Sequence, residues 1–184
     1  MKLYYPVRKP VIWNQRFGEN ATSVYKNLGL IGHNGIDFYA LDGFPIYAAH
    51  DGVVTYTGHD GSGGLGVVLR GQEGTEYFKT IYWHLKEGSI KVKPDQQVKT
   101  GDLLALADNT GMSTGAHLHF GLKFIAQGEA EWAWFNLNHD NGYLGAIDPE
   151  PYFTGIHAID VKITSIQEKV VELLKLLIDK LSKK

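Results

Sequence analysis

Hydrophobic and polar positions follow short, strand-like patterns through most of the chain. Between residues 36 and 124, β-branched and aromatic residues form brief runs separated by glycine, as in the segments 52–58 and 66–70. Closely spaced short strands with turn residues between them are typical of antiparallel β structure. The pattern predicts a mainly β domain built on an antiparallel, barrel-like sheet.

The pattern changes after residue 160, where apolar positions recur at intervals of three and four. That spacing predicts an amphipathic helix of roughly 18 residues. A capping box at 165–168 would begin it. The apolar stripe consists of Ile163, Ile166, Val170, Leu173 and Leu177.

Two parts therefore follow from the patterns: a β domain over residues 1–155 and an amphipathic C-terminal helix over 160–184. The helix needs a partner for its apolar stripe. We expect it to pack on the β domain and the protein to be a monomer, because about two heptads are short for a stable coiled-coil dimer. Self-association through the helix is the alternative.

Composition narrows the classes of function. A chain of 184 residues with 43% hydrophobic residues can bury one substantial core. Its net charge of −2 gives no reason to expect nucleic-acid binding, which usually needs a basic face. The chain has no cysteine, which excludes disulfides, thiolate metal sites and a cysteine nucleophile.

The first ten residues contain no apolar run that resembles a signal-peptide core. No later segment approaches the length of a transmembrane helix. We therefore expect a chain with neither a leader nor a membrane span.

Two histidines separated by one residue, His117 and His119, lie in an apolar segment that follows a glycine-rich turn. In a strand, residues two apart point to the same face, so both imidazoles would leave the sheet together while Leu118 and Phe120 face the core. Both imidazoles are potential metal ligands. A pair alone is equally consistent with two surface histidines.

Further upstream, His33 and Asp37 supply two more candidate ligands. An extended chain would hold them about 13 Å apart, and glycines at 32 and 35 disfavour a helix. We expect a turn with left-handed conformations at Asn34 and Gly35 to fold His33 back toward Asp37. Two imidazoles and a carboxylate are a typical ligand set for catalytic zinc, with the fourth position open.

A further candidate, His84, lies in the apolar segment 80–85. Strand alternation would place Tyr82 on the same face as His84. The other histidines have no partner at a suitable spacing, and we expect them to be solvated or hydrogen-bonded without a metal. These are His50, His59, His139 and His157.

These segments resemble the lysostaphin-type, or LytM-like, zinc endopeptidases, which cut peptide bonds in bacterial cell-wall peptidoglycan. The resemblance covers roughly residues 13–153. It implies a LytM-type fold and a zinc ion, Zn²⁺, as the cofactor. The matching motifs are His33-x-x-x-Asp37 with its internal Gly35, Tyr82-x-His84-Leu85 and the segment 113–120, which contains His117 and His119.

The resemblance also assigns roles. His33, Asp37 and His119 would bind zinc, while His84 and His117 would act on the water and the transition state. Tyr82 is a candidate substrate contact. The implied activity is hydrolysis of peptidoglycan cross-links by a metal-activated water.

Most LytM-like endopeptidases act outside the cytoplasm, at the cell wall or in the periplasm. Without a leader in the sequence, two origins are consistent with that location: removal of a leader, or release of a phage or prophage lysin by a partner. We favour the lysin. The sequence does not specify whether the bond that is cut lies in a glycine bridge or in a stem-peptide cross-link.

Two segments depart from the family pattern. Five glycines between residues 58 and 66 cluster around Asp60 and Ser62, and we expect a flexible loop there that rims a groove. The family usually has Gly-x-Gly-Asn here, where this chain has Leu65-Gly66-Val67. Residues 126–146 form an aromatic-rich insertion, which is either a small satellite core or a groove wall. We favour the satellite core because large aromatic side chains usually become buried.

Two other classes of function remain as alternatives. The first is a non-catalytic LytM-like domain that binds the cell wall or activates a partner amidase. The second is a biotinyl- or lipoyl-carrier-like domain, suggested by residues 92–104. A carrier domain would leave the clustered histidines unexplained. It also needs a lysine at an exposed hairpin tip to attach the cofactor, and no such lysine is present here. Intact candidate ligands favour the enzyme over the non-catalytic domain.

Overall fold

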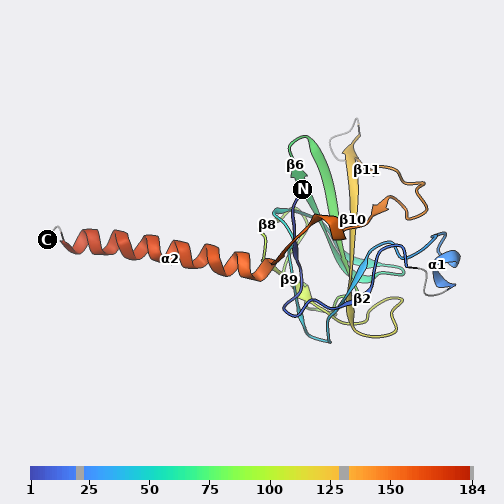
Figure 1. Cartoon of the computed structure of the whole chain (residues 1–184), viewed down its shortest axis with the longest axis horizontal. Coiled ribbons are helices and arrows are strands. Elements are labelled where there is room, and N and C mark those ends of the chain that lie inside the picture. Colours follow the sequence, from blue (N-terminus) through green and yellow to red (C-terminus); the bar gives the residue numbers. More distant parts are fainter. Residues whose placement is uncertain (20–22, 129–132, 183–184) are drawn as a thin grey trace.

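The computed structural model describes residues 1–19, 23–128 and 133–182. Most elements are short strands, followed by one long C-terminal helix (Figure 1). The elements in chain order are β1 (Leu3–Tyr5), β2 (Trp13–Gln15), α1 (Val24–Asn27), β3 (Ile36–Tyr39), β4 (Pro45–Tyr47), β5 (Gly52–Asp60), β6 (Gly64–Glu73), β7 (Glu76–Trp83), β8 (Gln97–Val98), β9 (Leu103–Leu106), β10 (His117–Gln127), β11 (Trp134–Asn136), β12 (Ala146–Ile147), η1 (Glu150–Tyr152), β13 (Phe153–His157) and α2 (Ala158–Ser182).

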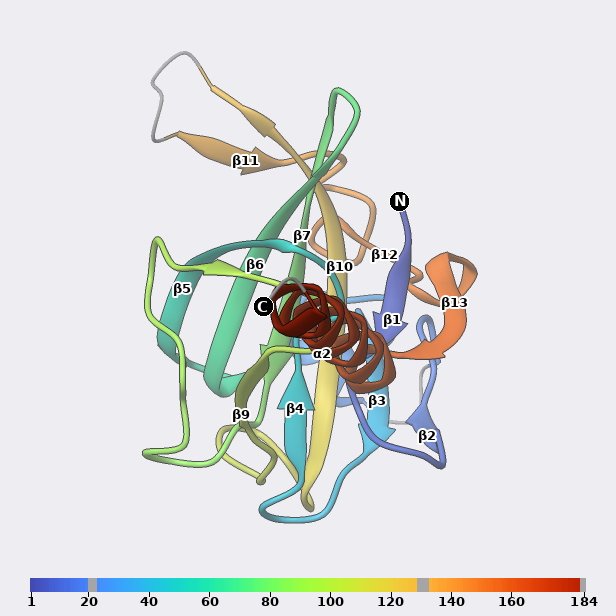
Figure 2. The same cartoon turned by 90° about the vertical axis from the view of Figure 1, so that its left-hand side faces the viewer.

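The main sheet contains nine strands in the described part of the chain, with the path β2-β3-β10-β7-β6-β5-β8. Strand β10 is its longest member and lies in the middle of the sheet (Figure 2). It pairs with β7 along one side and with β3, β12 and β11 in turn along the other. The predicted mainly β, antiparallel fold is confirmed, but the sheet is open and does not close into a barrel.

Alternation along β10 divides the sheet into two faces. Leu118, Phe120 and Leu122 are completely buried, whereas His117 and His119 remain partly exposed on the opposite face. The buried face packs into one core with residues of the small β4-β9 and β1-β13 sheets. Ladder hydrogen bonds on both sides hold β10 in place, so this strand is a rigid base for side chains that point away from the core.

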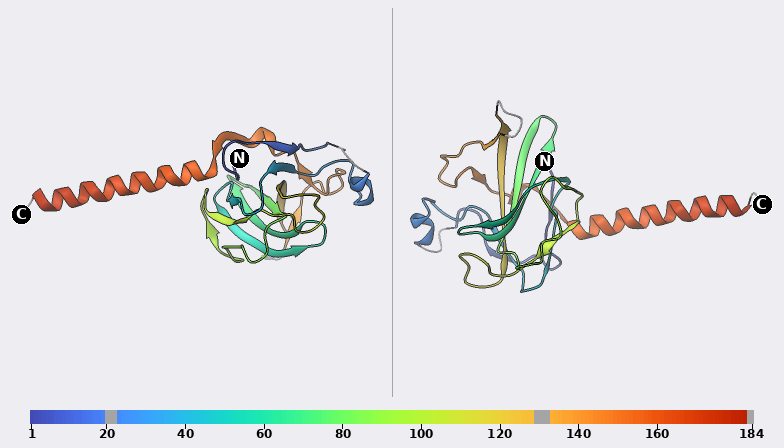
Figure 3. Two further views of the ribbon diagram at one scale, coloured as in Figure 1. Left: turned by 90° about the horizontal axis from the view of Figure 1, so that it is seen from below. Right: turned by 180° about the vertical axis from the view of Figure 1, so that it is seen from behind.

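The C-terminal helix α2 begins at Ala158, directly after β13, and the predicted capping box lies inside it. The first turns join the domain through an ion pair between Lys9 and Asp160 and a 2.7 Å hydrogen bond from Lys162 Nζ to Asp102. Beyond them the helix extends away from the domain (Figure 1 and Figure 3). The expectation that the helix packs back on the domain is therefore wrong.

The stripe that was expected to be covered is exposed. The exposed aliphatic residues of α2 are Ile163, Ile166, Val170, Val171, Leu173, Leu174, Leu176, Leu177, Ile178 and Leu181. Sequence periodicity identified the helix, but it carries no information about which surface the apolar residues contact. In the described part of the chain, no helix is both long and apolar enough to cross a lipid bilayer.

A buried histidine lies beneath the sheet, on the core side. His50 is 5% exposed, and its Nδ1 donates to the Asp51 carbonyl at 2.8 Å. Its Nε2 lies 2.8 Å from the Thr80 hydroxyl, which is 3.1 Å from the Tyr82 hydroxyl. Burial lowers the pKa of His50 to about 4. The imidazole is neutral at neutral pH, as expected for a hydrogen-bonded histidine without a metal.

Removal of residues 164–184 should leave the β domain intact. Only the first turns of α2 contact the domain, so we expect the melting temperature to change by no more than about 1 °C, less than the roughly 2–4 °C that 1 kcal/mol shifts a domain of this size. Differential scanning calorimetry at low protein concentration measures this. A fall of several degrees would show that the distal helix packs on the domain in solution.

Acid should destabilise the fold partly through His50. As pH falls from 6.5 to 4, the unfolded chain takes up a proton that the folded His50 does not, so the free energy of unfolding falls. The shift to about 4 corresponds to a loss of about 3 kcal/mol across that window. Urea unfolding of His50→Gln at several pH values should show a smaller acid loss than wild type.

His59→Gln is the matched control for this measurement, because His59 is exposed and pairs with Glu87 at the surface. Its pH dependence should match that of wild type. Equal acid losses in His50→Gln and wild type would contradict the role given to His50.

Candidate metal centre and groove

The register between β3 and β10 creates the centre of the site. Asp37 and His119 are directly opposite each other in the antiparallel ladder. Their side chains leave the same face of the sheet, and His119 Nδ1 lies 3.1 Å from Asp37 Oδ1. A carboxylate and an imidazole nitrogen are thus positioned by backbone pairing alone.

The third donor, His33, comes from the segment that enters β3. Its Nε2 lies 3.0 Å from His119 Nδ1 and 3.1 Å from Asp37 Oδ1. Its Nδ1 lies 3.1 Å from the Arg16 carbonyl. Because a carbonyl only accepts, Nδ1 carries the proton and Nε2 presents its lone pair to the cluster, the usual way a protein orients a ligating histidine.

The chain bends between His33 and Asp37, as expected, but by a different conformation. Neither Asn34 nor Gly35 has a positive φ, so the predicted left-handed turn is wrong. Gly35 is required for another reason: a Cβ there would lie 2.6 Å from the Phe120 carbonyl oxygen and 2.7 Å from two atoms of the His119 ring. Real side chains essentially never approach so closely.

The three donors suit a zinc-like ion. His33, Asp37 and His119 offer two nitrogens and one oxygen whose mutual separations are 3.0–3.1 Å. Tetrahedral ligands with bonds of about 2.0–2.2 Å have separations of roughly 3.3–3.5 Å. A small adjustment of these side chains would therefore accommodate the ion.

The ionisation states also suit a metal. Burial raises the pKa of Asp37, but the His119 and His33 imidazoles, each with a nitrogen 3.1 Å from Asp37 Oδ1, outweigh burial and hold that pKa far below its usual value. Burial lowers the pKa of His119, against the attraction of Asp37. An ionised carboxylate and a neutral imidazole are the forms that ligate metal ions.

His84 reaches this cluster through an unusual backbone conformation. It follows β7 with φ of 63°, a left-handed value that non-glycine residues rarely adopt. Its Nδ1 donates to the Thr110 carbonyl at 2.7 Å, and its ring centre lies 4.5 Å from that of His117 and 6.1 Å from that of His119. Burial lowers the pKa of His84 to about 4.

His117 lies on the same face of β10 as His119, as predicted. Its Nδ1 lies 2.8 Å from the Gly115 carbonyl, and its Nε2 lies 3.5 Å from Asp37 Oδ2. His84 and His117 thus share one arrangement: Nδ1 donates to a backbone carbonyl, so the neutral ring has an unprotonated Nε2. Each can accept a proton at that nitrogen.

Tyr82 does not belong to this site. It is completely buried, its hydroxyl accepts a 3.0 Å hydrogen bond from the Ala49 backbone N–H, and its ring packs edge-on against Phe120. The expectation that Tyr82 contacts substrate is therefore corrected. Tyr82 and His84 do not share a face, because the left-handed conformation of His84 breaks the alternation at the end of β7.

A groove of about 1140 Å³ runs over the sheet and includes the five histidine and aspartate side chains of the site. The turn at residues 61–63 contributes to its rim, as predicted, but the loop is shorter than expected because β5 runs to Asp60 and β6 begins at Gly64. Ile81 and Trp83 line it as well, one residue out of phase with the buried Tyr82. If Tyr82 is assigned to the core, strand alternation alone places Ile81 and Trp83 on the opposite face, which is the face of the groove.

The aromatic insertion extends the sheet and forms part of the groove. Within it, β11 pairs with β10, so the expected satellite core is not what the described residues form. Trp134 on β11 lines the groove, with its ring centre 4.9 Å from that of Tyr77 and 4.3 Å from the Arg70 guanidinium carbon. Trp132, another aromatic residue of the insertion, lies outside the described residues.

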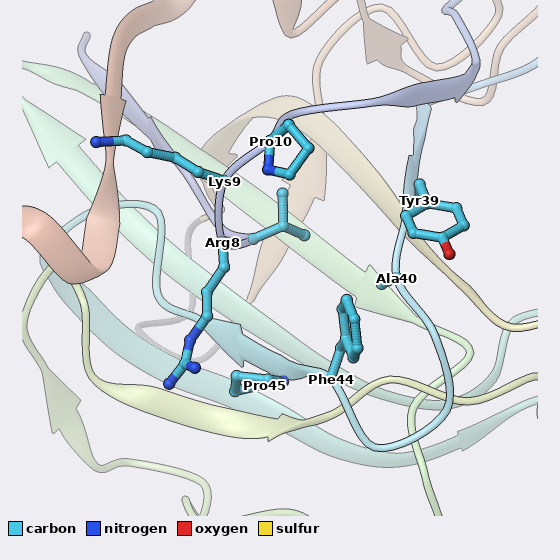
Figure 4. A pocket seen from close by; sticks show the side chains of 8 residues that line it. Arg8, Lys9, Pro10, Tyr39, Ala40, Phe44 and Pro45 are labelled. Carbon is cyan, nitrogen blue, oxygen red and sulfur yellow. The ribbon is translucent and has the colours of Figure 1, made fainter.

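A separate pocket of about 40 Å³ lies between the segment after β1 and the β3–β4 connection (Figure 4). Its lining includes Arg8, Tyr39 and Phe44 and none of the metal-centre residues. The other histidines behave as expected. His157 is buried with Nδ1 2.7 Å from the Val7 carbonyl, and His139 is exposed.

Known proteins are similar to this chain in sequence and in fold. The peptidoglycan DD-endopeptidase ShyA of Vibrio cholerae is 43% identical over 90 residues, which are 49% of this chain and 20% of that protein. The DD-carboxypeptidase/endopeptidase Mpg of Neisseria meningitidis is 37% identical over 95 residues, 52% of this chain and 21% of that protein. This chain therefore spans about a fifth of the length of these relatives.

The solved catalytic domain of lysostaphin, an antimicrobial peptidase from Staphylococcus simulans, superposes with a TM-score of 0.59. It is 25% identical in sequence, and the match covers 77% of this chain and 91% of that domain. Residues 31–130, more than half of the chain, match the family described as Peptidase family M23. That match includes His33, Asp37 and His119, and the chain belongs to peptidase family M23.

Proposed function

We propose that this chain is a zinc-dependent endopeptidase that hydrolyses peptide bonds in the cross-links of bacterial peptidoglycan. The observation that carries the proposal is the convergence of three donor atoms, from His33, Asp37 and His119, in a groove large enough for a peptide. The name of the relative ShyA, a peptidoglycan DD-endopeptidase, supports peptidoglycan as the substrate. The place of action is then the cell wall or the periplasm.

His33, Asp37 and His119 are the residues that would hold the ion. Two neutral imidazoles and one carboxylate leave a divalent cation with a net positive charge. When bound, zinc supplies Lewis acidity, which lowers the pKa of water and polarises a peptide carbonyl. Asp37 and His119 are fixed on β3 and β10, and His33 is held in the segment before β3 by the Arg16 carbonyl, so little reorganisation accompanies the reaction.

His84 and His117 handle the protons. With Nδ1 bonded to a backbone carbonyl, each ring has an Nε2 that accepts a proton from the attacking water. The protonated ring can then donate to the oxyanion or to the leaving amine. The carbonyls of Thr110 and Gly115 act as positioning groups, because they fix the tautomer and the ring orientation of the two histidines.

Digestion of purified peptidoglycans tests the proposal directly. Peptidoglycans with glycine-bridged and directly cross-linked stem peptides are incubated with the protein, with and without chelator, and the fragments are identified by mass spectrometry. We expect new amino termini at cross-links and no cleavage after chelation. Binding without cleavage of any peptidoglycan would instead identify a non-catalytic domain.

Zinc content should depend on each of the three donors. The purified protein should contain about one zinc per chain, and His119→Ala or Asp37→Ala should lose most of it, because two remaining ligands form an incomplete site. Inductively coupled plasma mass spectrometry provides the measurement. His139→Ala, which changes an exposed histidine outside the groove, is the control and should retain zinc. Normal zinc in both ligand variants would refute the assignment.

Substitution of the proton-transfer histidines should separate catalysis from metal binding. His84→Ala and His117→Ala should retain zinc and the fold but lose turnover by on the order of 10²-fold or more. Peptide cleavage assays, metal analysis and circular dichroism measure the three properties. Loss of zinc from His117→Ala together with its retention in His119→Ala would mean that these two residues have exchanged roles.

A further inference from the structure

Three cationic side chains form a row across the groove. Arg70 on β6 is directly opposite Lys79 on β7, and Lys79 is directly opposite Lys123 on β10. All three side chains are partly buried and line the same groove as His119. Three neighbouring strands thus each contribute one positive charge at the same level of the sheet.

This arrangement is unfavourable for the fold by itself. Like charges directly opposite each other destabilise a sheet. Burial lowers the pKa of Lys79, and burial together with Lys79 lowers the pKa of Lys123 to about 8. The net charge of the whole chain is −2, so the row is a local feature and not part of a generally basic surface.

The row is held in place without being neutralised. The Arg70 guanidinium lies over the Trp134 ring, and Lys123 Nζ donates to the Leu144 carbonyl at 2.8 Å. Asp60, another groove residue, attracts Lys123 only at longer range. Among the described residues, no acidic side chain forms an ion pair with any of the three cations.

The row lies at a defined distance from the metal centre. Lys123 is four residues after His119 on the same face of β10, which corresponds to about 13 Å along a strand. Between them β10 has Gly121, which has no side chain, and the neighbouring strand has Ile81. An extended peptide with its scissile bond at the metal centre would cross this open floor and reach the row after about four residues.

We propose that Arg70, Lys79 and Lys123 bind a carboxylate of the substrate peptide about four residues from the bond that is cut. This inference rests on the proposed endopeptidase function and specifies its substrate as an acidic peptide. Side-chain carboxylates and a free C-terminal carboxylate share the required chemistry. The carboxylate provides the negative charge that the described part of the fold does not supply to the row.

Matched peptides test the inference. Cross-linked peptides released from a peptidoglycan that the protein cleaves are compared with the same peptides whose carboxylates have been converted to carboxamides. We expect amidation to lower kcat/KM roughly tenfold for wild type, because hydrogen bonds to charged groups are among the stronger ones. The preference should shrink as salt rises. Synthetic peptides amidated only at the C-terminus or only at side chains identify which carboxylate is bound.

The double variant Lys79→Gln and Lys123→Gln should cleave both forms at similar rates, with a melting temperature no lower than that of wild type, because it relieves the repulsion between two lysines. Lys93→Gln is the control, since Lys93 is exposed and outside the groove. It should keep the wild-type preference. An equal preference in the double variant and wild type would overturn the inference.

A binding measurement separates this inference from the proposed catalytic function. Isothermal titration calorimetry of synthetic acidic and amidated cross-link peptides with His117→Ala reports affinity without turnover, and these peptides are available whether or not the protein cleaves peptidoglycan. We expect the acidic peptide to bind roughly tenfold more tightly. Equal affinity, or no binding of either peptide, would refute the carboxylate site even where cleavage occurs. Failure of wild type to cleave any peptidoglycan would refute the endopeptidase while this binding preference could still be measured.

Discussion

The antiparallel register between β3 and β10 is the constraint on which the rest of the structure depends. It sets Asp37 opposite His119, while Leu118, Phe120 and Phe38 enter the core from the other face. Because side chains alternate, a slip of one residue would send both candidate ligands into the core and the apolar residues into the groove. Burial of the apolar residues therefore stabilises the same register that assembles the candidate metal centre, and the hydrophobic effect positions polar side chains that it does not contact.

Much of this arrangement was predictable from the sequence because it follows from local periodicity. Alternation around His117 and His119 predicts which side chains enter the groove, and glycine-punctuated runs predict the antiparallel strands. The spacing of His33 and Asp37 implies a bend, although the conformation of that bend depends on packing against His119. Similarity to lysostaphin-type enzymes is the basis of the proposed distinction between ligands and proton-transfer residues, which periodicity does not provide.

The errors share a physical cause, namely that tertiary contacts override local patterns. Alternation at the end of β7 predicts one face for Tyr82 and His84, but the backbone bonds that join His84 to Gly63 and Asp108 hold it in a left-handed conformation. The helix α2 follows its predicted period, yet the partner of an apolar stripe is not specified by that period. The cationic row was also missed, because Arg70, Lys79 and Lys123 are far apart in sequence and meet only through strand pairing.

Close packing around Gly35 has a consequence for how this site tolerates change. The His119 ring rests against the backbone at position 35, so even one methyl group there would displace a donor of the candidate metal centre. In a saturation mutagenesis of the chain, position 35 should be as intolerant as the three proposed ligands, although glycine has no side-chain donor atom. The boundary of a functional site is in this case set by excluded volume, and it includes a residue with no chemistry of its own.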